Sequence, residues 1–105
     1  MLTEPSCQPG ENCGAGDEGA FKGIFVRDLK MLAEIAPANQ DKYLSKYNSF
    51  FAAQAASIEK NDTTIIHIPP TNITLHLFGM FWNGPHNPIG SDTHESALEA
   101  LVASL

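Results

Sequence analysis

The stretch FKGIFVRDLKMLAEIA, residues 21–36, decides the fold class of this chain. When its residues are stepped at about 100° each, as in an α-helix, the apolar side chains cover more than half of the circumference. A helix that packs on one side only shows a narrower apolar stripe. The stretch therefore predicts a helix over residues 17–36 that is covered on two sides, as in a two-layer helical assembly.

Three residues of this stretch are expected to have specific contacts in the folded chain. Gly23 costs a helix roughly 1 kcal/mol against alanine, so it predicts a close approach of a neighbouring helix, which a missing side chain permits. Lys22 is expected to reach an acidic group, Asp17 or Glu18. Asp28 falls within the apolar arc and is expected to bond to a helix end or to an arginine.

Two further helices are predicted downstream. Residues 39–60 place aromatic and aliphatic side chains at helical spacing, and Asn39 is a suitable N-cap. Residues 92–105 carry one apolar stripe, and Asp92 and Glu95 have the spacing of a capping box. Together with the first helix, these segments make the predicted fold all-α in the main.

The remaining segments are expected to be a loop and a hairpin. Residues 1–16 hold prolines and glycines around each cysteine and little apolar mass, which is typical of a loop. In residues 61–91, the segments TTIIHI and NITLHLF are β-branched and partly alternating, and this pattern predicts a short β-hairpin followed by a loop. Pro69 and Pro70 exclude a tight two-residue turn between the strands.

The composition argues against some classes of partner. The net charge is −6, and only six Lys and Arg residues are scattered along the chain. Phosphate backbones reward clustered basic residues, so no nucleic-acid partner is expected. No apolar run approaches the roughly 20 residues that cross a bilayer, and the N-terminus lacks the basic start and apolar core of a signal peptide. Membrane association stays open.

Two pairs of residues nevertheless favour a secreted origin. Cys7 and Cys13 lie in the Pro/Gly-rich loop and predict a disulfide, as expected in an oxidising compartment. Asn61 and Asn72 begin the tripeptides NDT and NIT, which match the N-glycosylation pattern. A signal peptide would then lie upstream, and the chain would be part of a longer secreted precursor.

No set of residues in the chain has the spacing of a catalytic or metal centre. Asp17 and Glu18 form an adjacent acidic pair, but their place at a helix start predicts capping rather than glycoside cleavage. His67 and His76 could face each other across the hairpin, yet no third ligand is indicated for zinc. The sequence therefore predicts no catalytic residue, no metal and no cofactor.

Trp82, in the segment FWNGP, is the best candidate for a ligand contact. Sugar rings stack on indole faces, and the amide of Asn83 could bind sugar hydroxyls. The structural alternative is that Trp82 plugs the loop against the helices, with its ring in the core. The residues alone leave both interpretations open.

Four segments in order resemble the C-terminal portion of glycoside hydrolase family 76. They are GDEGAFKGIFVRDLKMLAE, YLSKYNSFFAAQAASI, GMFWNGP and HESALEALVAS. The family comprises α-1,6-mannanases and related fungal cell-wall proteins, and its fold is an (α/α)6 barrel. The resemblance implies hydrolysis or transglycosylation of α-1,6-mannan, an extracellular or cell-wall location, and substrate contacts at Asp17, Lys22 and Trp82. Asn83, beside Trp82, is a further predicted substrate contact.

The chain departs from the family in one respect that bears on activity. The family's catalytic signature is an adjacent pair of aspartates, and this sequence contains none. We therefore expect residues 1–105 to be one partial domain, the C-terminal part of the barrel, which is inactive alone and lacks the N-terminal part. The alternatives are a small secreted non-catalytic protein that binds a glycan or a protein, and a remnant without function. A barrel piece should expose a large apolar face.

Overall fold

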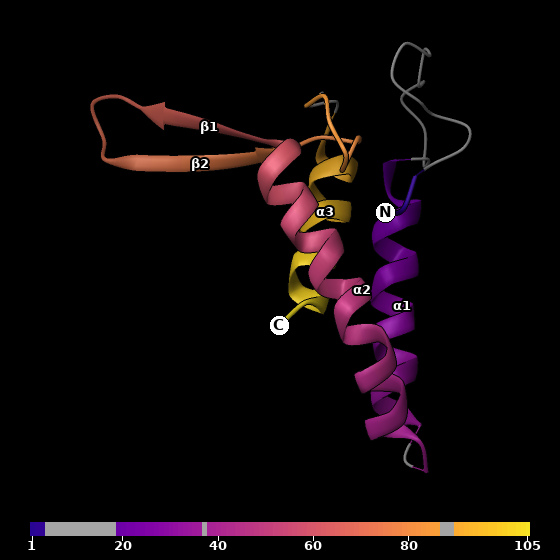
Figure 1. Cartoon of the computed structure of the whole chain (residues 1–105). Helices are drawn as coiled ribbons and strands as arrows, with labels where there is room; N and C mark the ends of the chain where they lie inside the picture. Colours follow the sequence, from indigo (N-terminus) through magenta and orange to yellow (C-terminus); the bar gives the residue numbers. More distant parts are fainter. Residues whose placement is uncertain (4–18, 37, 87–89) are drawn as a thin grey trace.

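The computed structural model describes residues 1–3, 19–36, 38–86 and 90–105, which form three helices and one hairpin (Figure 1). The elements are α1 (Phe21–Ile35), α2 (Gln40–Asn61), β1 (Thr63–Ile68), β2 (Ile73–Phe78) and α3 (Ser91–Ala103). The helices lie side by side, and the hairpin projects away from them near the end of α2 (Figure 1). The prediction of a mainly α-helical chain with a short hairpin is confirmed.

Most of the bulky apolar side chains of α1 lie outside its contact with α2 and α3, whereas Leu29 is half-buried and packs against the core. The face toward these two helices buries Lys22 and three smaller residues, Gly23, Val26 and Ala33. The opposite face exposes larger apolar side chains: Phe21, Ile24, Phe25, Met31, Leu32 and Ile35. This arrangement is the reverse of an ordinary surface helix. The predicted spread of apolar residues is present, but the described residues cover only one side of α1.

The first turn of α1 is held by α3 rather than by a capping side chain of its own. The helix begins at Phe21 rather than at residue 17, and its N-cap Ala20 makes no side-chain hydrogen bond. Gly23 N–H donates instead to Ser96 Oγ at 2.8 Å. A Cβ atom on Gly23 would lie 2.5 Å from Ser96 Cα. The predicted close approach of a neighbouring helix at Gly23 is therefore confirmed.

Ion pairs link the charged side chains of α1 to one another and to α3. Arg27 Nε lies 3.1 Å from Asp28 Oδ1, which confirms that Asp28 bonds to an arginine. The same guanidinium lies 3.4 Å from Glu99 Oε1 on α3, and Lys30 Nζ lies 3.9 Å from Glu34 Oε1. Contact with Asp28 raises the pKa of Arg27. No helix in the described ranges is both long and apolar enough to span a membrane.

The starts of α2 and α3 differ from the predicted caps. Asn39 occupies the N-cap position of α2, but its side chain makes no capping hydrogen bond. The capping box predicted on Asp92 and Glu95 was wrong, because α3 begins after Gly90. Thr93 Oγ1 accepts the Gly90 N–H at 3.3 Å and donates to the Gly90 carbonyl at 2.9 Å. A threonine inside the first turn therefore closes the start of α3.

The hairpin has the long turn that the prolines predict. β1 and β2 pair antiparallel around residues 69–72. His67 pairs with Thr74, and His76 pairs with Ile65, so the expectation that the two histidines face each other was wrong. They share one face of the hairpin but stand at different register positions, and His67 Nδ1 lies 3.1 Å from Thr74 Oγ1.

One apolar core joins the three helices to the segment that follows β2. Its buried members are Val26, Phe51, Ile58, Phe78, Trp82, Ala97, Ala100 and Ala103. α3 contributes only alanines, and small side chains let it approach α1 and α2 closely. Trp82 is the largest fully buried side chain, with 1% of its surface exposed. Its position is that of a plug between the loop and the helices.

Candidate functional site

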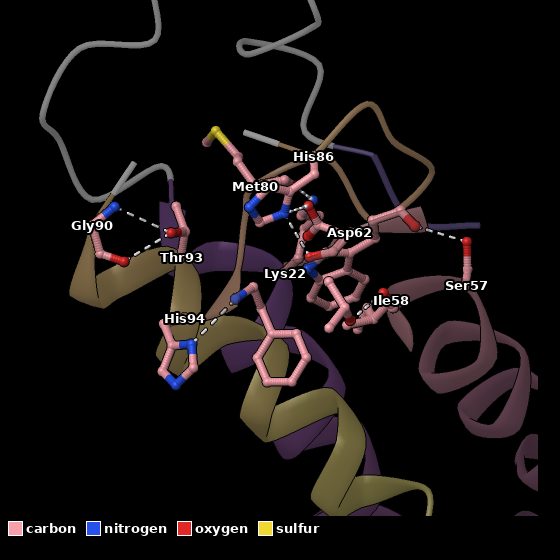
Figure 2. A network of polar contacts seen from close by, with 12 residues as sticks. Lys22, Ser57, Ile58, Asp62, Met80, His86, Gly90, Thr93 and His94 are labelled. Atoms are coloured by element: carbon pink, nitrogen blue, oxygen red, sulfur yellow. Dashed lines mark hydrogen bonds and ion pairs between the residues drawn. The ribbon is translucent and has the colours of Figure 1, made fainter. Parts of the chain in front are cut away.

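A cluster of charged side chains lies at the end of the bundle where the start of α1, the end of α2 and residues 79–86 meet (Figure 2). Lys22 is 5% exposed and Asp62 is 0% exposed. Lysine and aspartate are almost never buried to this degree unless they are paired. We call Lys22, Asp62 and His86 the charged cluster.

Lys22 ties α1 to residues 79–86, which we call the aromatic loop. Its Nζ donates a hydrogen bond to the carbonyl oxygen of Met80. The same atom lies 4.6 Å from the centroid of the Trp82 ring, at cation–π distance. The acidic partners expected from the sequence, Asp17 and Glu18, lie outside the described residues. Within them, the Lys22 charge acts on the carboxylate of Asp62.

Asp62 directly follows α2 and places a carboxylate inside the molecule. Its backbone N–H donates to the Ile58 carbonyl at 2.9 Å, which fixes its position as the C-cap. Its Oδ1 lies 3.4 Å from His86 Nδ1. Burial raises the pKa of Asp62, while the charges of His86 and Lys22 act against this rise. The ionised carboxylate therefore depends on these two neighbours.

His86 closes the charged cluster from the other side. Its Nδ1 lies 2.8 Å from the Asp62 carbonyl oxygen. Both oxygens near Nδ1 are acceptors, so this nitrogen carries a hydrogen. His86 Nε2, both carboxylate oxygens of Asp62 and Trp82 Nε1 are buried without a hydrogen-bond partner among the described residues. Buried polar atoms of this kind are uncommon in native folds and point to a constrained site.

The aromatic loop presents one amide to solvent. Ser57 Oγ donates to the Trp82 carbonyl at 2.7 Å, which anchors the loop to α2. Gly84 has a φ of 77°, in the left-handed region that favours glycine. Between them lies Asn83, whose side chain is exposed and whose Oδ1 lies 3.5 Å from Ser57 Oγ. The loop thus buries its indole and exposes its amide.

The predicted site residues therefore take different places. Lys22 and Trp82 are brought into direct contact, both buried. Asn83 lies next to Trp82 and is accessible. Asp17 lies outside the described residues. The role of all four in substrate binding stays a prediction.

The predicted modification sites are also separated by the fold. Asn61 is the last residue of α2, and its Nδ2 donates to Ser57 Oγ at 3.0 Å. Asn72 is exposed in the turn of the hairpin. Cys7 and Cys13 lie outside the described residues. Glycosylation and the disulfide stay predictions.

Sequence reasoning missed Asp62 and His86. One signal was present, because no Asp, Glu, Lys or Arg lies between Asp62 and Asp92. This signal does not identify the site, because most side chains of the uncharged segment belong to the exposed hairpin. It does not reveal Lys22 as the partner, since that contact joins distant parts of the chain.

Comparison with protein families gives a match that covers the chain. The pattern of glycosyl hydrolase family 76 matches residues 1–105, which is the whole chain. Searches of curated proteins and of solved structures found no match. The family match confirms the resemblance drawn from the four sequence segments, and it implies a glycoside hydrolase type of function with a glycan as substrate.

Proposed function

The chain belongs to glycosyl hydrolase family 76, and we propose that it forms the C-terminal part of an enzyme that hydrolyses or transfers α-1,6-linked mannan in the fungal cell wall. The observation that carries this proposal is the family match over all residues. The finer choice of mannan rests on the resemblance of the sequence segments to α-1,6-mannanases.

The outer face of α1 supports the proposal of a partial barrel. In an (α/α)6 barrel, an inner helix is covered both by outer helices and by the other inner helices. α1 has apolar side chains on two sides, and those of the outer side are exposed. Leu32 is 56% exposed and Ile35 is 70% exposed. An apolar face of this kind fits missing helices better than it fits a stand-alone binding protein.

The acidic residues support the proposal that this chain is inactive alone. Glycoside cleavage usually needs two carboxyl groups flanking one bond, roughly 5 to 10 Å apart. The sequence has no adjacent pair of aspartates. Asp62 is buried beside Lys22 and His86 and is inaccessible to a polysaccharide. We therefore propose that the catalytic pair belongs to an N-terminal part of the enzyme.

Glycan contact by this chain is proposed at the aromatic loop. Asn83 supplies an exposed amide that can both donate to and accept from sugar hydroxyls. Lys22 and Trp82 lie beneath it, and Asp17 is proposed as a further contact. The proposal extends to an extracellular or cell-wall location, a disulfide between Cys7 and Cys13, and glycans on the two sequon asparagines.

The experiment is a binding titration of the 15N-labelled chain with α-1,6-mannotriose, followed by NMR. The proposal predicts shifts of the Asn83 side-chain amide and none with the matched α-1,6-linked glucose trisaccharide. Asn83→Ala should weaken binding, whereas Asn48→Ala, an exposed asparagine on α2, should not. Absence of binding, or equal response to both trisaccharides, would contradict the proposal.

A further inference from the structure

We propose that Lys22 is a positioning residue, which acts with Asp62 and His86 as a charged clamp that fixes the aromatic loop and thereby places Asn83. Its significance for glycan binding rests on the proposed function, while the clamp itself does not. The contact between Lys22 on α1 and Met80 in the aromatic loop joins residues 58 positions apart in the sequence.

Lys22 cannot reach a polysaccharide from its place in the fold. Its side chain is buried, and its ammonium group is already engaged by the Met80 carbonyl and by the Trp82 ring. Both partners belong to the aromatic loop. A buried charge that bonds to the backbone of a loop holds that loop more strongly than a neutral donor would.

Asp62 and His86 hold the same loop from the α2 side. His86 is itself a loop residue, and its Nδ1 contacts both the carbonyl oxygen and the carboxylate of Asp62. Gly79 N–H donates to the Asp62 carbonyl at 3.4 Å, at the other end of the loop. Both ends of the aromatic loop therefore contact Asp62, and Lys22 contacts the loop between these ends, at Met80 and Trp82.

Several titratable groups lie at this end of the bundle. They include Lys22 on α1, Asp62 after α2, His86 in the loop, and Asp92 in the first turn of α3, next to Gly19. On α3, His94 accepts the Phe78 N–H at 3.3 Å and stacks on the Phe78 ring. The ammonium group offsets the buried carboxylate. Removal of Lys22 therefore takes away a positive charge that acts on the buried carboxylate of Asp62.

The clamp also fixes the position of Asn83. The turn that carries Asn83 is closed by Gly84 N–H donating to the Phe81 carbonyl at 2.5 Å. Trp82 precedes Asn83 and is the single tryptophan of the chain. When the clamp holds the indole in the core, the adjacent amide is fixed at the surface. Release of the clamp frees both residues together.

The test measures loop opening without any glycan. Lys22→Met keeps the stem and removes the charge, and His86→Gln breaks the clamp at a less buried position. Amide hydrogen exchange at Gly79 and Gly84 should accelerate by about tenfold or more in each variant, because a hydrogen bond involving a charged group is lost. Exchange at Ala100 in α3 should not change. Acrylamide quenching of Trp82 should increase.

Controls separate positioning from general destabilisation. Lys22→Arg, which keeps the charge, should retain most of the protection, and Lys30→Met, the same change two turns along α1, should leave the loop unaffected. Unchanged exchange at Gly79 and Gly84 in both clamp variants, or an equal effect of Lys30→Met, would overturn the proposal. If Lys22→Met does not fold, hydrogen exchange at Gly79 and Gly84 in His86→Gln tests the proposal.

A glycan arm distinguishes the clamp from the proposed function. Asn83→Ala should weaken α-1,6-mannotriose binding and leave hydrogen exchange unchanged, whereas Lys22→Met should affect both. If Trp82 of the wild-type chain is protected from acrylamide but the chain binds no mannotriose, the result would contradict the proposed function and would not contradict the clamp.

Discussion

Asp62 shows how a single residue can depend on contacts from distant parts of the sequence. Its carboxylate is fully buried, and the two side chains whose charges act on it, Lys22 and His86, come from distant positions in the sequence. Breaking such a group of charges costs more than the group contributes to stability, because the remaining charge is left buried and uncompensated. Asp62 is therefore a residue that constrains the fold more than it stabilises it.

The stability of the chain should depend on pH through Asp62. Its pKa is raised above the usual 3.8 by burial. Below pH 3.8 the group is protonated in both states. As pH rises through this value, only the unfolded chain ionises, so the wild type loses stability until the folded pKa is passed. In Asp62→Asn, which has no carboxyl group at this position, this loss of stability with rising pH should be absent.

The measurement is urea unfolding of the wild type and Asp62→Asn from below pH 3.8 to neutral pH. The stability of the variant relative to the wild type should increase as pH rises. A difference that is constant or decreases with pH would contradict the raised pKa. Asp41→Asn, an exposed aspartate in the first turn of α2, serves as the control.

At the scale of elements, the contact between α1 and α3 determines how closely the bundle packs. α3 presents Ser96 together with alanines to α1, and α1 presents Gly23. The first turn of α1 obtains its hydrogen bond from this contact rather than from a cap. Gly23 therefore permits the close approach of α1 and α3, and its N–H is the first-turn donor of α1 that Ser96 satisfies.

Gly23→Ala should destabilise the chain although alanine is the better helix former. The added Cβ would meet the Ser96 backbone, its Cα at 2.5 Å and its carbonyl oxygen at 2.7 Å. Overpacking of this kind costs about 1 to 3 kcal/mol, against a propensity gain of roughly 1 kcal/mol. We expect a lower urea midpoint at an unchanged denaturant slope.

The control for this prediction is Ala56→Gly at an exposed position of α2, which measures helix propensity alone. If Gly23→Ala raised stability by as much as Ala56→Gly lowers it, propensity would dominate and the close approach to Ser96 would not matter.

At the scale of the whole molecule, the sequence predicts the features that depend on local patterns. Helical periodicity, the turn prolines and Gly23 each predict an element or a contact that the structure contains. The Asp92–Glu95 capping box failed because Thr93 competes for the same helix start. Asp62 and His86 were missed because their role arises only when three separate segments meet. Periodicity cannot predict such long-range contacts.

The exposed apolar face of α1 and the absent aspartate pair lead to the same conclusion about the whole molecule. The described residues hold the aromatic loop against the helices and expose an apolar face on α1, and the sequence contains no adjacent pair of aspartates. The chain is therefore expected to contribute to a glycan site without carrying out the reaction.

The most direct test is reducing-sugar release from α-1,6-mannan by the purified 105-residue chain. The proposed absence of a catalytic carboxylate pair predicts no release above a heat-denatured control, under conditions in which an active α-1,6-mannanase degrades the same substrate. Measurable release would contradict the account, because it would require a catalytic pair within this chain.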